Sequence, residues 1–100
     1  IDDCIEATLK LFDSEHHGPI NIGSEEKVSI NEMIDKIEEI ASKKVKRNYQ
    51  LNKPKGVRGR NSDNTLIRYQ LNWEPKLSLY QGLEKTYKWI FTEIKKKHNQ

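Results

Sequence analysis

Cysteine is almost absent from this 100-residue chain, and long apolar runs do not occur in it at all. The single cysteine, Cys4, excludes an internal disulfide and fits a reducing compartment, so we expect a cytoplasmic protein. Without a run of about 18 apolar residues, the sequence predicts no membrane-spanning segment and no membrane partner. Cys4 stands beside the apolar stripe of its segment, which favours a buried structural thiol over a nucleophile.

Hydrophobic residues are also scarce, at 34% against 33% charged residues, and the mean hydropathy is −0.92. This composition is lean for a free-standing globule, although it is too apolar and too periodic for a disordered chain. A chain of this length makes at most one small domain, which buries roughly 60–70% of its unfolded surface. The chain opens on Ile1, already inside a helical pattern. We therefore expect residues 1–100 to form one lobe of a longer protein.

Charge of one sign does not dominate, because the net charge is +3 and the isoelectric point is near 9.0. This mild basic excess permits an anionic ligand without requiring nucleic acid. A small nucleic-acid-binding module is nevertheless an alternative, and its basic cluster would comprise Lys43, Lys44, Lys46, Arg47, Lys53, Lys55, Arg58 and Arg60. No recognised nucleic-acid motif surrounds that cluster, so we expect no nucleic-acid partner.

Apolar residues at helical spacing predict four helices in this chain. The expected ranges are 2–13, 29–43, 65–71 and 79–97. The second helix has the clearest start, because Ser29 and Glu32 form a capping box. Alternating apolar and polar residues predict two short strands, at residues 19–24 and 45–51. The expected fold class is therefore α/β, with about four helices and two short strands.

Two patterns in the sequence suggest metal binding or catalysis, but neither has the spacing or local structure that the chemistry requires. His16 and His17 are adjacent on a turn and have no cysteine or further histidine at ligand spacing. Tyr49 and Lys53 have the spacing of a Tyr-x-x-x-Lys pair, which requires both side chains on one helix face. That segment reads as extended, and Pro54 follows it directly. We predict no catalytic residue and no metal ligand in this chain.

The loop at residues 54–64 is the one stretch where glycine, proline and positive charge gather without a hydrophobic period. Gly56 and Gly59 flank Arg58, and glycine lets a backbone approach a ligand closely. The guanidinium of Arg58 offers a planar fork of donors that suits phosphate or carboxylate. An ordinary solvated basic turn explains the same composition equally well.

Several strings of this sequence occur in the order seen in extended short-chain dehydrogenase/reductases, the NAD-dependent epimerase/dehydratase family. The strings are Ile1-Asp2-Asp3-Cys4, Asn21-Ile22-Gly23-Ser24, Gly56-Val57-Arg58-Gly59-Arg60-Asn61-Ser62-Asp63-Asn64, and Leu71-Asn72-Trp73-Glu74-Pro75. The likeness covers nearly the whole chain. The nine-residue loop string is its most specific part, and it most resembles the nucleotide-sugar epimerases that act on GDP-mannose.

This resemblance implies that residues 1–100 are the C-terminal substrate-binding lobe of an NAD-dependent nucleotide-sugar epimerase. The Rossmann domain of that enzyme is absent from residues 1–100. Such enzymes oxidise the sugar transiently with NAD, invert carbon centres by acid/base chemistry and return the hydride. The resemblance places NAD and the catalytic residues in the absent N-terminal domain, so the fragment alone is expected to be inactive. It assigns Arg58 to the diphosphate of the nucleotide sugar, with Arg60 and Asn61 as further substrate-binding candidates. The parent enzyme is expected to be a homodimer.

Asn72 departs from the family pattern, which usually has glycine between the leucine and Trp73. Asparagine tolerates a positive φ, so the turn can still form. Trp73 itself is expected to anchor the core. The departure at Asn72 leaves another nucleotide-sugar epimerase or dehydratase, such as a UDP-glucose 4-epimerase, as the alternative parent.

Overall fold

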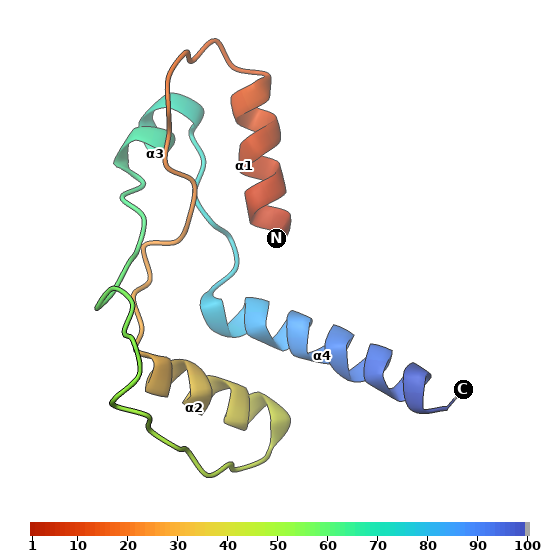
Figure 1. The fold of residues 1–100 in the computed structure, drawn as a ribbon. Coiled ribbons are helices and arrows are strands. Elements are labelled where there is room, and N and C mark those ends of the chain that lie inside the picture. The colour runs from red at the N-terminus through yellow and green to blue at the C-terminus, as the bar shows by residue number, and fades with distance from the viewer. Residues whose placement is uncertain (100) are drawn as a thin grey trace. The chain divides into compact units, whose positions relative to one another are not determined.

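The computed structural model describes residues 1–99, and this part of the chain contains four helices (Figure 1). The helices are α1 (Asp2–Phe12), α2 (Ile30–Ala41), α3 (Thr65–Leu71) and α4 (Leu79–His98). All four predicted helices are confirmed, with ends that move by no more than two residues. None of the described helices combines the length and the apolar character that a membrane crossing requires.

Residues 1–99 contain no β-strand, so the predicted α/β class and its two short strands are wrong. A strand requires a ladder of backbone hydrogen bonds to a neighbour. In the first expected strand, Ser24 accepts a backbone hydrogen bond from Ser62 N at 2.8 Å, but no ladder continues from it. The second expected strand is attached to α2 by side chains instead. Alternation of apolar and polar residues describes an extended segment, and it does not supply a pairing partner.

The chain divides into two compact units. Unit 1 consists of Ile1–Lys27 and Arg60–Ser78, and it contains α1 and α3. Unit 2 consists of Val28–Gly59 and Leu79–Gln100, and it contains α2 and α4. One of the three boundaries between the units falls inside the loop at residues 54–64, between Gly59 and Arg60.

Unit 1 has a small core made of Ala7 from α1, Ile67 from α3 and Trp73. Ile20, Ile22 and Leu71 pack against this core and are partly buried. The predicted role of Trp73 as a core anchor is confirmed, since only 3% of its surface is exposed. Asn72 ends α3 in the left-handed conformation, with φ 50° and ψ 44°, so the expected positive φ is confirmed too.

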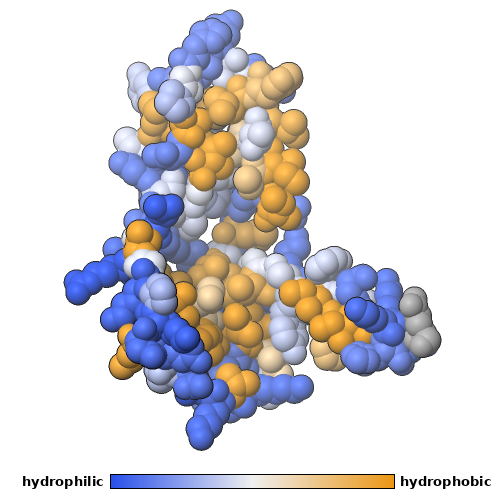
Figure 2. Space-filling model, viewed as in Figure 1, coloured by the Kyte–Doolittle hydropathy of each residue, from blue (hydrophilic) through white to orange (hydrophobic). Residues whose placement is uncertain are grey.

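The apolar stripe of α1 lies on the surface of unit 1. Ile1 is 89% exposed and Phe12 is 84% exposed, and Ile5 and Leu9 between them are also exposed. Figure 2 shows hydrophobic side chains gathered along this helix. Cys4 is exposed as well, so the prediction of a buried thiol is wrong. Helical spacing places these large apolar residues on one face of α1. Unit 1 buries a different part of the helix, the part that contains Ala7.

In unit 2, α2 packs against α4 and begins with the predicted capping box. Ser29 Oγ accepts from Glu32 N at 3.0 Å, and Ser29 N donates to Glu32 Oε1 at 3.4 Å. The extended segment that follows α2 is attached through Arg47, which donates to Asp35, Glu38 and Asn31. The bond to Asp35, followed by the bond to Glu38, raises the pKa of Arg47 above its ordinary value.

Candidate functional site

The predicted substrate-binding residues fall on both sides of the division between the units. Arg58 belongs to unit 2, whereas Arg60 and Asn61 belong to unit 1. All three are exposed. Within residues 1–99 no ion pair is formed by Arg58 or by Arg60, so both guanidinium groups are available to a ligand. No described glycine adopts a positive φ, so Gly56 does not serve a left-handed turn.

In unit 1 the end of the loop lies beside the segment that precedes α2 (Figure 1). Ser62 N donates to Ser24 O at 2.8 Å, and Asn61 Nδ2 donates to Glu25 O at 2.9 Å. Gly23 permits this approach, because a Cβ atom added there would lie 3.0 Å from Ser62 Cβ. A larger residue at this position would force the two segments apart.

Asn64 is the buried polar residue that connects these two segments, with only 1% of its surface exposed. Its Nδ2 donates to Gly23 O at 2.9 Å, and its Oδ1 accepts from Ser62 Oγ at 2.6 Å. Its backbone N donates to Glu25 Oε1 at 3.1 Å, and its backbone O accepts from Arg68 N at 3.0 Å. Both polar ends of the side chain are therefore satisfied, as burial requires.

Glu25 extends this connection to α3. Its Oε1 accepts from Arg68 at 2.9 Å as well as from the backbone of Asn64. The bond from Arg68, followed by the bond from Asn64 N, lowers the pKa of Glu25 below its ordinary value. Asp63 contributes separately, because its Oδ1 accepts from Thr65 N and Thr65 Oγ1 at the start of α3. Those two bonds also lower the pKa of Asp63.

An open pocket of about 530 Å³ lies where the two segments of unit 1 meet. Its lining consists of Asn21, Ile22, Gly23, Ser24, Arg60, Asn61 and Ser62. Arg60 is the one charged residue in this lining, and the others offer amide, hydroxyl and backbone groups. A free guanidinium among uncharged polar groups suits an anion that also carries hydroxyl groups. Arg60 and Asn61 are thus brought together at a pocket, and Arg58 is not part of its lining.

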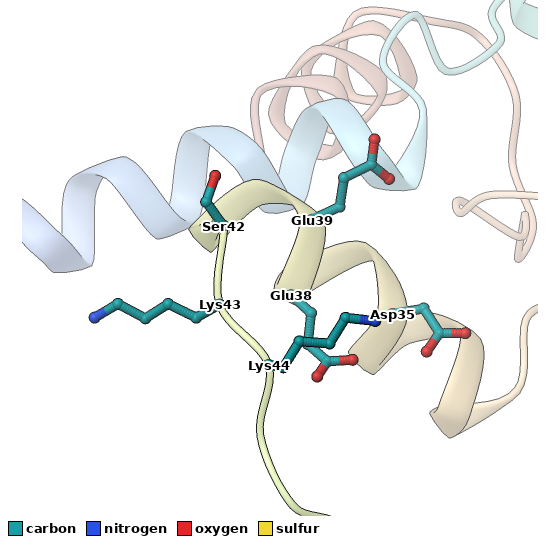
Figure 3. A pocket seen from close by; sticks show the side chains of 6 residues that line it. All are labelled: Asp35, Glu38, Glu39, Ser42, Lys43 and Lys44. Atoms are coloured by element: carbon teal, nitrogen blue, oxygen red, sulfur yellow. The ribbon is translucent and has the colours of Figure 1, made fainter.

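A larger pocket of about 640 Å³ lies in unit 2 at the C-terminal end of α2 (Figure 3). It is lined by Asp35, Glu38, Glu39, Ser42, Lys43 and Lys44. Its charges are of both signs, and Arg47 already engages Asp35 and Glu38. Across residues 1–99, no group of three or more side chains is placed to hold a metal ion. The larger pocket therefore contains none of the predicted site residues and offers less to an anionic ligand.

The sequence did not reveal the residues that hold the pocket together. Glu25 reads as part of a polar turn, and Arg68 reads as an exposed residue of a short helix. Asn64 lies inside the loop string, but nothing in the string marks it as buried. Its one detectable signal is its position directly before α3, where a short polar side chain is a common helix cap. Its side chain makes no capping bond, and it bonds Gly23 and Ser62 instead.

Comparison with known proteins agrees with the resemblance seen in the loop string. The chain is 46% identical over 96 residues to GDP-mannose 3,5-epimerase from Arabidopsis thaliana, which covers 96% of this chain and 25% of that protein. The chain is similar along its whole length to GDP-mannose 3,5-epimerases. The rice protein GDP-mannose 3,5-epimerase 1 (Oryza sativa subsp. indica) is 45% identical over 100 residues. The match covers 100% of this chain and 26% of the rice protein. The predicted resemblance to nucleotide-sugar epimerases is therefore confirmed.

More distant similarity extends to another enzyme whose name includes a nucleotide sugar. The probable GDP-L-fucose synthase 1 of Oryza sativa subsp. japonica is 32% identical over 98 residues, with 94% of this chain and 29% of that protein covered. No family model matches the chain. The chain spans about a quarter of the length of these relatives, and the matched part is their C-terminal region.

Proposed function

We propose that this chain is the substrate-binding lobe of an NAD-dependent nucleotide-sugar epimerase, and that its substrate is GDP-mannose. The observation that carries this proposal is the similarity to GDP-mannose 3,5-epimerases over the whole chain. The unit 1 pocket supports it, because a pocket with one free guanidinium and several uncharged polar groups matches the chemistry of a nucleotide sugar. In this proposal the lobe binds and orients the substrate, and the bond-making residues lie outside residues 1–100.

Arg60 is the residue best placed to bind the diphosphate. It lines the pocket, it has no ion-pair partner within the described residues, and its fork of donors can bind two phosphate oxygens at once. Asn61 forms part of the same wall and is fixed by its bond to Glu25 O. Arg58 remains a second candidate for the diphosphate, because it is exposed and unpaired, but it belongs to unit 2.

The cofactor NAD is proposed to bind outside this chain. Dinucleotide binding of the Rossmann type needs a parallel sheet and a glycine-rich phosphate loop that opens a helix. Residues 1–99 contain no strand, and the one glycine in the first turn of a described helix, Gly82 of α4, is not part of a glycine-rich loop. We therefore assign NAD, which supplies the transient oxidation of the sugar, to another domain of the parent enzyme.

The exposed apolar stripe of α1 is proposed to pack against that cofactor domain. Four large apolar side chains on one exposed helix face are unusual for a surface in contact with water alone. By resemblance, the parent is proposed to be a cytoplasmic homodimer. These assignments concern the whole enzyme. This chain covers about a quarter of the length of the relatives it matches.

The test compares arginine variants in the full-length protein that carries this sequence, assayed for turnover of GDP-mannose with NAD. We expect Arg60→Ala to raise the KM for GDP-mannose roughly ten- to a hundredfold, because losing a charge-assisted phosphate contact costs about 1.5–3 kcal/mol. Arg58→Ala measures the contribution of the other candidate. Lys55→Ala is the matched control, since it removes an exposed charge from the same loop, and its KM should stay within about twofold.

An unchanged KM in both Arg60→Ala and Arg58→Ala would contradict the diphosphate role of the loop. A wild-type protein that turns over UDP-glucose faster than GDP-mannose would favour the alternative parent, a UDP-sugar epimerase. Binding of DNA or RNA that weakens steeply between two salt concentrations would instead support the nucleic-acid alternative.

A further inference from the structure

We propose that Asn64 and Glu25 are positioning residues that set the place of Arg60 in the substrate pocket. This inference rests on the proposed function, because it deepens the assignment of the unit 1 pocket to a nucleotide sugar. Neither residue lines that pocket. Both act by holding together the two segments that form its walls.

The walls of the pocket come from residues 21–24 and residues 60–62. Asn64 joins these walls, since its side chain bonds Gly23 O in one wall and Ser62 Oγ in the other. Ser62 is also bonded through its backbone to Ser24. Arg60 is only two residues from Ser62, so the spacing of the walls limits where its guanidinium can lie. A change in the Asn64 contacts must therefore move Arg60 relative to residues 21–24.

Asparagine is required at this position for a chemical reason. Gly23 offers a carbonyl oxygen, which needs a donor, and Ser62 offers a hydroxyl, which donates to Oδ1. Aspartate has the same shape but would place a carboxylate oxygen against the Gly23 carbonyl, and it has no donor to give. It would also bring a second negative charge close to Glu25, which bonds the backbone of the same residue.

Glu25 holds the backbone of Asn64 and the side chain of Arg68. A single carboxylate oxygen accepts from Asn64 N and from Arg68, so it joins the segment before α2 to the first turns of α3. Glu25 also presents its backbone oxygen to Asn61, the neighbour of Arg60. Removing its side chain would free Asn64 N and Arg68 together while leaving the pocket lining unchanged in sequence.

The experiment measures steady-state kinetics of the full-length protein with NAD and GDP-mannose. We expect Asn64→Asp to raise the KM about tenfold and to leave kcat within about twofold, the pattern of lost substrate binding without a lost catalytic group. Glu25→Ala, at an exposed position, should raise the KM in the same direction and carries the test if Asn64→Asp does not fold. Asp63→Ala is the control, because it removes the bonds to Thr65 at the start of α3 and touches neither wall.

A double-mutant cycle separates positioning from general destabilisation. If Asn64 acts through Arg60, Asn64→Asp should change the KM less than about twofold in an Arg60→Ala background. Three outcomes would overturn the inference. The first is an equal rise in KM with and without Arg60, and the second is a KM rise in Asp63→Ala as large as in Asn64→Asp. The third is a fall in kcat that matches the rise in KM. If the wild-type protein turned over no nucleotide sugar, the proposed function would fail, and the inference would fail with it.

Discussion

Asn72 occupies a position whose backbone conformation favours glycine. It ends α3 with φ 50° and ψ 44°, a conformation in which glycine is the usual residue. Its backbone N donates to Arg68 O at 3.0 Å, which closes the last turn. The chain then turns toward Trp73, which is buried in the core of unit 1. Asparagine can serve here because its short polar side chain tolerates the left-handed region.

Substitution of Asn72 tests this requirement at the residue scale. Asn72→Val should destabilise the folded state by about 1–2 kcal/mol, because a β-branched residue clashes in the left-handed conformation. Asn72→Gly should be neutral or slightly stabilising. Hydrogen exchange of the α3 amides in the full-length protein measures both effects. Equal protection in Asn72→Val and the wild type would show that the left-handed turn is not needed.

Cys4 and Asn64 show what residue type alone does not reveal. Cysteine is usually buried and asparagine usually exposed, yet Cys4 lies on the surface and Asn64 is buried. Burial depends on what the rest of the fold places opposite a residue. Gly23, Ser62 and Glu25 come from positions up to 41 residues away in sequence from Asn64. Local pattern therefore had no means of identifying it.

At the scale of elements, helices were predictable and extended segments were not. A helix satisfies its own backbone, so apolar spacing and the Ser29 cap were sufficient to place α2 within two residues. A strand needs a second strand, and residues 45–51 have none within the described chain. Arg47 holds that segment to α2 instead, by contacts with Asp35 and Glu38. Val45 N adds a bond to Glu38 at 2.9 Å.

Loss of the Arg47 side-chain contacts should release this segment. In Arg47→Met the guanidinium bonds disappear while the apolar part of the side chain is largely kept. We expect faster hydrogen exchange at the Val45 amide and unchanged exchange in the middle of α2. Lys46→Met is the matched control, since it removes a neighbouring charge and leaves the Arg47 contacts intact. Equal exchange rates in the two variants would count against the anchoring role of Arg47.

At the scale of the whole molecule, both units leave large apolar side chains exposed. In unit 1 several of these lie along α1. In unit 2 they include Trp89, Ile90, Phe91 and Ile94 of α4. Unit 1 has three buried core residues, and α2 and α4 have no fully buried residue. Cores of this size give little stability, so the exposed apolar faces are expected to contribute through contacts with the rest of the enzyme.

The isolated 100-residue chain should therefore behave differently from the full-length protein. We expect it to bind the dye ANS, to associate in size-exclusion chromatography and to show no epimerase activity with added NAD and GDP-mannose. Exposed apolar surface explains the first two results, and the proposed location of the catalytic residues in another domain explains the third. A monomeric chain with epimerase activity of its own would contradict the proposal that the chemistry lies elsewhere.

The amino-acid sequence by itself determined the helices, the left-handed turn at Asn72, the burial of Trp73 and the resemblance to nucleotide-sugar epimerases. Each of these depends on local spacing, on one residue's backbone preference or on an uninterrupted string. Only the tertiary structure decided that residues 19–24 and 45–51 are not strands, and that Arg60 rather than Arg58 lines the pocket with Asn61. Those outcomes depend on partners far away in the chain. The loop supplies the guanidinium groups, and the bonds of Asn64 to Gly23 and Ser62 join the two segments that line the pocket.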